Sequence, residues 1–237
     1  MTEAEIKRAE KDAERDAKEL GLLLLLAFKS RDGSIVKSVR FDIDKGKFYV
    51  NDRAVASRTI ISFLERINDK MSRRLVKITS DLEAGRITVD EWKRSFDRTI
   101  KSSHILAGAF AVGGIVLASR NTFVNTQIDL QLEFADAFSE EIRKNKAGSF
   151  AKIRARAKGY TRAAQQTFVN LELELVKQSG FRKEAFNILR SNEPCNPKNG
   201  IISCPQLTAK AWMPVDEMVR IGDRACGIYC RCYIAYR

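Results

Sequence analysis

Cysteine is the residue type in this chain whose clustering most clearly suggests chemistry. All five cysteines lie near the C-terminal end, and none precedes them: Cys195, Cys204, Cys226, Cys230 and Cys232. Four thiolates can hold a zinc ion in tetrahedral geometry, and these residues are far enough apart in sequence to bring two loops to one metal. The clustering predicts a separate, cysteine-built unit that follows a body without cysteines.

Two further interpretations of these cysteines are open. They form disulfides if the protein reaches oxidising surroundings, for example in a particle released from a cell. Alternatively, they stay free as buried thiols. If Cys230 and Cys232 lie on an extended strand, their side chains point to the same face, which disfavours a bond between them and favours a facing loop as partner. Zinc is the one cofactor that the sequence suggests, as one of these three interpretations.

A second candidate site is a cationic stretch in the preceding helical region. The chain from Lys144 to Arg162 contains no acidic residue. A helix with many cations can neutralise several phosphates without reading base sequence. We expect either a nucleic-acid contact or a plain solvated helix face, formed by Lys152, Arg154, Arg156, Lys158 and Arg162.

Charge and missing motifs narrow the function. The chain has 42 Lys and Arg against 30 Asp and Glu, a formal net charge of +12, which favours a polyanionic neighbour. Its single histidine, His104, falls in an apolar helical stretch, where we expect a structural role. No nucleotide-binding loop and no nucleophile elbow accompanies it. The sequence therefore predicts a protein that is not an enzyme.

The positions of apolar residues predict a mainly α-helical protein with three parts. Residues 1–52 are expected to form an N-terminal helix, over residues 3 to about 28, and a β-hairpin of 39–43 with 48–50. Residues 53–180 are expected to form a body of several helices. Residues 181–237 are expected to form a small cysteine-rich α+β module whose first strand lies in 181–190 and whose last lies in 231–236.

Local signals mark the helix boundaries in the body. One helix should end near Ala84 and Gly85, and the next should begin with a capping box between Thr88 and Glu91. Glycines in the following apolar stretch permit a close approach of another backbone or a kink. Two further helices are expected over residues 121–145 and 150–178.

The apolar stretches 22–28 and 105–118 are shorter than the roughly 20 residues that span a bilayer. The first residues alternate acids and bases and do not resemble a secretory signal. We therefore expect no membrane association and synthesis in the cytosol.

The C-terminal segment also carries an ordered set of short motifs: Ser191-Asn-Glu-Pro-Cys195, Cys204-Pro205, Ala211-Trp212-Met-Pro214-Val215-Asp216-Glu217-Met218, Ile221-Gly222-Asp223, Cys226-Gly-Ile-Tyr-Cys230-Arg231-Cys232 and Tyr236-Arg237. In this order they resemble the C-terminal signature of minor head proteins of tailed bacteriophages, which are related to the Mu F-like head morphogenesis family. Upstream, the segment Leu82 to Trp92 resembles such proteins more weakly.

This resemblance implies a structural virion protein, assembled in the host cytoplasm and located in the head or at the head-tail junction. It implies a minor head or portal-vertex component that acts in head assembly and in genome packaging or delivery. The partners would be phage portal, capsid or connector proteins in a symmetric assembly of several copies, together with packaged DNA. The alternative is a head-tail connector, also called an adaptor, or a capsid cement protein.

Overall fold

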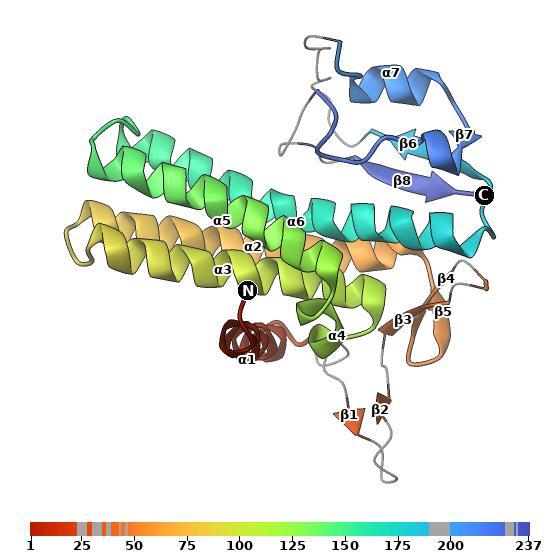
Figure 1. The fold of residues 1–237 in the computed structure, drawn as a ribbon, viewed down its shortest axis with the longest axis horizontal. Helices are drawn as coiled ribbons and strands as arrows, with labels where there is room; N and C mark the ends of the chain where they lie inside the picture. Colours follow the sequence, from red (N-terminus) through yellow and green to blue (C-terminus); the bar gives the residue numbers. More distant parts are fainter. Residues whose placement is uncertain are drawn as a thin grey trace.

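The structure is a computed structural model of the chain, and it describes residues 1–22, 28–29, 35–36, 39–42, 44–45, 47–189, 200–225, 230 and 232–237. The protein is mainly α-helical, as predicted, with a small antiparallel sheet near the N-terminus and a cysteine cluster near the C-terminus (Figure 1).

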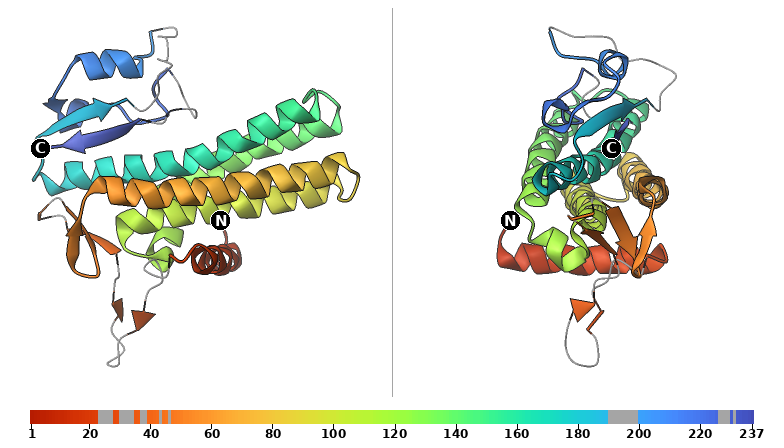
Figure 2. Two further views of the ribbon diagram at one scale, coloured as in Figure 1. Left: turned by 180° about the vertical axis from the view of Figure 1, so that it is seen from behind. Right: turned by 90° about the vertical axis from the view of Figure 1, so that its right-hand side faces the viewer.

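Four long helices form the body: α2 (Ser57–Glu83), α3 (Val89–Val112), α5 (Thr122–Arg143) and α6 (Phe150–Ser179). They run side by side as two helical hairpins, with α6 packed on α2 and α3, and α5 packed on α3 (Figures 1 and 2). The predicted capping box begins α3, because Thr88 accepts a hydrogen bond from the Glu91 backbone and the Glu91 carboxylate accepts one from the Thr88 backbone.

Glycines shape the join between α3 and α5. A Cβ at Gly108 would lie 2.6 Å from Val124 Cγ2, so only glycine allows α5 to approach α3 this closely. Gly113 and Gly114 have φ of 90° and 138°, which end α3 and lead into the short helix α4 (Ile115–Ser119). The glycines therefore produce the close approach and the break that the sequence indicated.

An aromatic cluster fills the end of the bundle where α2 connects to α3 and α5 connects to α6. Trp92, Phe96 and Phe138 are fully buried, and the Tyr160 ring packs on Phe96 with centroids 5.0 Å apart. The indole N–H of Trp92 donates to Thr79 Oγ1 at 3.1 Å, so the one polar atom of that side chain is paired. Packed rings therefore fill this end of the bundle, and the buried indole N–H has a hydrogen-bond partner.

The N-terminal helix is shorter than the sequence predicted. Helix α1 (Glu3–Glu19) ends where Leu20 caps it and Gly21 takes a φ of 68°, so the expected continuation to residue 28 is wrong. Residues 23–27 lie outside the described part of the chain. Helix α1 lies crosswise over the bundle and contacts α3 and α4 (Figures 1 and 2).

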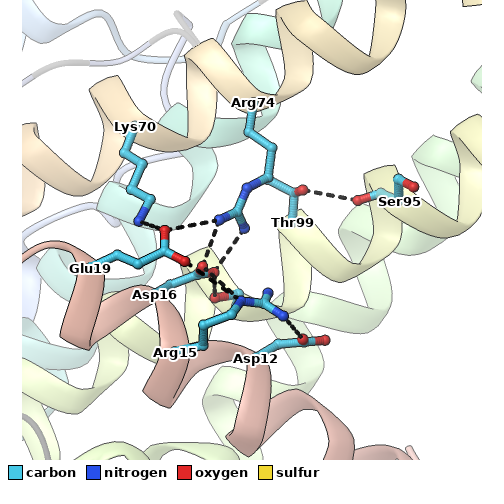
Figure 3. A network of polar contacts seen from close by, with 9 residues as sticks. Asp12, Arg15, Asp16, Glu19, Lys70, Arg74, Ser95 and Thr99 are labelled. Atoms are coloured by element: carbon cyan, nitrogen blue, oxygen red, sulfur yellow. Dashed lines mark hydrogen bonds and ion pairs between the residues drawn. The ribbon is translucent and has the colours of Figure 1, made fainter. Parts of the chain in front are cut away.

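A buried carboxylate fastens α1 to the body (Figure 3). Asp16 is fully buried and accepts two hydrogen bonds from Arg74 of α2, at 2.9 and 2.6 Å, and one from Ser102 of α3, at 2.6 Å. Burial alone would raise the pKa of Asp16, but the hydrogen bonds from Arg74 and Ser102 outweigh it, and the pKa lies below its usual value. Lys70 and Glu19 form an ion pair beside it.

The predicted hairpin is part of a larger sheet. Strands β3 (Val39–Asp42) and β4 (Lys47–Val50) pair with Phe41 opposite Phe48. Strand β5 (Arg53–Val55) adds to β4, so the expectation that helix resumes at Arg53 is wrong and α2 begins at Ser57. Two very short strands, β1 (Phe28–Lys29) and β2 (Ile35–Val36), pair separately.

The C-terminal module packs against the second half of α6 (Figure 1). Its sheet has the order β7-β6-β8, with β6 (Glu184–Ile188) central between β7 (Met213–Pro214) and β8 (Tyr233–Tyr236). Helix α7 (Cys204–Ala209) lies against β6, and the 3-10 turn η2 (Val215–Glu217) contacts α6. The first and last strands fall within the ranges that the sequence predicted.

Candidate metal centre

Three cysteines converge in the core of the C-terminal module. Cys204, Cys230 and Cys232 are buried, and their Sγ atoms all lie within 4.8 Å of one another. A zinc ion binds sulfur at about 2.3 Å in tetrahedral geometry, which places two ligand sulfurs roughly 3.8 Å apart. The spacing of the three sulfurs therefore fits one metal ion.

A capping box holds the first of these cysteines, Cys204, in place. Ser203 caps α7 by accepting from the Gln206 backbone at 3.4 Å, and Gln206 Oε1 accepts from the Ser203 backbone at 2.8 Å. Pro205 stands in the first turn, where its missing N–H costs no hydrogen bond. Cys204 thus sits on a rigid helix start that points into the module.

The other two ligands come from the segment that leads into β8. Cys230 and Cys232 are both buried, consistent with the prediction that their side chains point to one face. Strand β8 pairs with β6 in antiparallel register, with Ile234 opposite Asn187. The sheet therefore carries Cys232 to the cluster, while α7 brings Cys204 to it from a distant part of the sequence.

The crowding of the three sulfurs affects the ionisation of Cys232. Hydrogen bonds with Cys204 and then Cys230, together with burial, raise the pKa of the Cys232 thiol well above its usual value. A divalent ion reverses this preference, because a coordinating thiol binds as the thiolate.

The described cysteines form no disulfide. Cys204 Sγ and Cys230 Sγ lie 3.5 Å apart, far beyond a sulfur–sulfur bond of about 2.05 Å, and Cys232 is also free. Cys195 and Cys226 lie outside the described residues, so the part predicted for them in zinc or disulfide chemistry stays a prediction.

Two buried polar side chains beside the cluster were not found from the sequence. Arg224 is only 2% exposed and lies with Nη1 4.0 Å from Cys204 Sγ. Asn187, also buried, accepts from Arg224 Nη1 at 2.7 Å and donates to the Cys204 carbonyl at 3.1 Å. A lone arginine in a loop gives no sequence signal of burial, because most arginines lie at the surface.

The basic stretch does not form a single face. Arg154 makes an ion pair with Glu83 of α2, whereas Arg156 pairs with Glu141 of α5 and lies over the Phe138 ring. These two arginines thus reach towards different neighbouring helices. Lys152 and Lys158 are exposed.

Lys158 and Arg162 line an open groove of about 430 Å³ between α6 and α2. Glu65 and Asp69 line its other side, so carboxylates and cations face the same space. The nucleic-acid contact of the five basic residues stays a prediction, and the two exposed lysines are its best-placed members.

His104 lies in the core of the bundle. Its Nδ1 is 2.8 Å from Thr167 Oγ1, and complete burial lowers the pKa of the ring to about 3. The imidazole is therefore neutral at pH 7.

No family model matches the chain, and neither the curated proteins nor the solved structures include a significant match. In the described part of the chain, no helix combines the length and the apolar character needed to cross a bilayer.

Proposed function

We propose that this chain is a structural protein of a tailed-phage virion, a minor head or portal-vertex component that acts in head assembly and in genome packaging or delivery. One observation carries the proposal: the described residues of the C-terminal motifs that resemble minor head proteins lie in one module. The thiols of Cys204, Cys230 and Cys232 share its core with Met213 and Ile221. Motifs whose described residues share one core fit a single structural unit better than a chance series of short matches.

The outer face of the same module explains the Trp-x-Pro motif. Trp212 packs on Phe186 with ring centroids 5.6 Å apart, and the Arg237 guanidinium lies 4.5 Å above the indole. Arg237 also donates to Glu184 at 2.6 Å, and Pro214 pairs with Glu184 in the sheet. Trp212 thus packs on the sheet, and Arg237 lies over the indole ring.

We further propose that the module binds zinc through its three described cysteines. The ion would tie α7 to β8 and replace crowded neutral thiols by paired charges. Metal analysis of the purified protein, combined with a thiol count, tests this part. We expect about one zinc per chain and three thiols that react only after chelation; a metal-free protein with fully reactive thiols would contradict it.

Fractionation of phage particles tests the virion assignment. Mass spectrometry of purified virions and procapsids should find the chain at a fixed ratio to portal protein. Absence from both particles would refute the assignment, whatever the metal content of the purified protein.

A head-tail connector or capsid cement protein is the second candidate, because apolar side chains are exposed on the body. Leu130 and Phe134 of α5 are 42% and 46% exposed, and Leu117 of α4 is 42% exposed. A subunit that packs into a ring would cover such side chains. The ratio of this chain to portal or capsid subunits in particles separates the candidates.

The proposed contact with packaged DNA concerns the exposed lysines of α6. Replacing Lys152 and Lys158 by Gln should weaken salt-sensitive DNA retention, because two phosphate contacts are lost. The matched control is the exchange of the exposed Lys11 and Lys18 of α1 for Gln, which removes the same charge elsewhere. Equal retention by both variants would favour a plain solvated helix face.

A further inference from the structure

The guanidinium of Arg224 is buried in the C-terminal module. No ion pair joins it to an acidic side chain in the part of the chain that the structure describes. Its described hydrogen-bond acceptors are uncharged: the Val219 carbonyl at 3.1 and 2.7 Å, Asn187 Oδ1 at 2.7 Å and Met218 Sδ at 3.6 Å. A buried charge is costly unless an opposite charge lies nearby.

The cysteine cluster is a described group that can supply this charge. Arg224 Nη1 points to Cys204 Sγ at 4.0 Å, and the other two sulfurs lie within 4.8 Å of that sulfur. Three thiolates around a divalent ion leave one net negative charge, which a single guanidinium balances. The module then buries a neutral unit instead of an isolated cation.

We propose that Arg224 is a positioning residue of the metal centre, which supplies the counter-charge that the thiolate-bound ion requires. It also holds Asn187, whose amide donates to the Cys204 carbonyl at 3.1 Å and to Thr208 Oγ1 at 2.8 Å. The Asn187 amide thus binds both the start of α7, at Cys204, and its last turn, at Thr208. Groups that surround a metal ligand in this way commonly change metal affinity by about 10- to 100-fold.

This inference rests on the zinc site proposed above and is tested by replacing Arg224 while all cysteines are kept. Arg224→Gln keeps polar atoms but removes the charge, and Arg224→Lys keeps the charge but loses the planar fork. Arg220→Gln is the matched control, because Arg220 is exposed and pairs with Glu174 away from the cluster. Zinc affinity is measured by chelator competition, and cobalt substitution reports thiolate ligation through its charge-transfer absorption.

We expect Arg224→Gln to bind zinc at least tenfold more weakly than wild type, with the cobalt absorption retained. Arg224→Lys should stay within about threefold of wild type, and Arg220→Gln should be unchanged. Equal affinity of wild type and Arg224→Gln would overturn the proposal, as would a tenfold loss in Arg224→Lys.

If Arg224→Gln fails to fold, the affinity of Arg224→Lys decides alone. A wild-type protein that binds no zinc would instead refute the metal site itself, so the two failures are distinguishable.

Discussion

The two ends of the molecule have cores that are built from different kinds of side chain. At the distal end of the bundle, Trp92, Phe96 and Phe138 fill the space between long helices with rings that are 4.6 to 6.2 Å apart. In the C-terminal module, three thiols, a guanidinium and an amide are buried together with apolar side chains such as Met213 and Ile221. The first core gains its free energy from apolar burial, whereas the second also buries thiols and a guanidinium that the proposed ion would pair.

The comparison indicates why the module contains every cysteine. Its strands are short, and β7 contributes only Met213 and Pro214. A small unit buries too little apolar area to hold such strands and usually needs a disulfide or a metal. The bundle has four long helices and needs neither.

Metal removal should produce the largest difference in stability between the two ends of the molecule. Structural zinc contributes about 10–16 kcal/mol in small zinc-binding peptides, so chelation should unfold the module while the bundle stays folded. Hydrogen exchange should show lost protection in 184–188 and 204–209 and unchanged protection around Trp92 and Phe138. Cys204→Ser should reproduce this pattern without a chelator. Uniform protection before and after chelation would remove the proposed difference between the two cores.

Truncation of an aromatic ring should have the next largest effect, and only on the bundle. Phe138→Ala should lower the free energy of unfolding by about 3–5 kcal/mol, since it empties space between Trp92, Phe96 and Tyr160. Phe134→Ala on the same helix is the matched control and should change it by less than about 0.5 kcal/mol, because Phe134 is exposed. Urea unfolding measures both, and similar losses would contradict the packing described for the bundle. Metal content should be unchanged in either variant.

The smallest effect concerns His104, which lies in the body core beside Thr167. Because its pKa falls from 6.5 in the unfolded chain to about 3 in the folded one, only the unfolded chain takes up a proton as the pH drops between these values. Stability from the neutral ring is complete above pH 6.5 and is lost on acidification, by about 2 kcal/mol between pH 7 and pH 5.

His104→Gln should lack this part of the pH dependence in urea unfolding. Acid loss of metal affects wild type and variant alike, so the difference between them isolates the imidazole. Identical pH dependence would show that the pKa of His104 does not fall when the chain folds.

Much of the fold could be predicted because helix periodicity and caps are local. The Thr88–Glu91 capping box, the end of α2 at Glu83 and the two glycines after α3 act through neighbours only a few residues away. Errors occurred where a local pattern was ambiguous. The apolar run after Leu20 continued a helical pattern, but helix α1 ends before Gly21. Strand β5 consists of residues that have no strong preference for either helix or strand.

The sequence by itself determined the helical body, the hairpin and the existence of a cysteine-built module, since each follows from composition or from spacing along the chain. Only the tertiary structure decided which groups meet. It places Cys204 beside Cys230 and Cys232 and buries Arg224 next to them. It also pairs Arg154 and Arg156 with carboxylates of two different helices. The physical reason is that such contacts join residues that are distant in sequence. They depend on how whole helices and strands pack together, which no local pattern encodes.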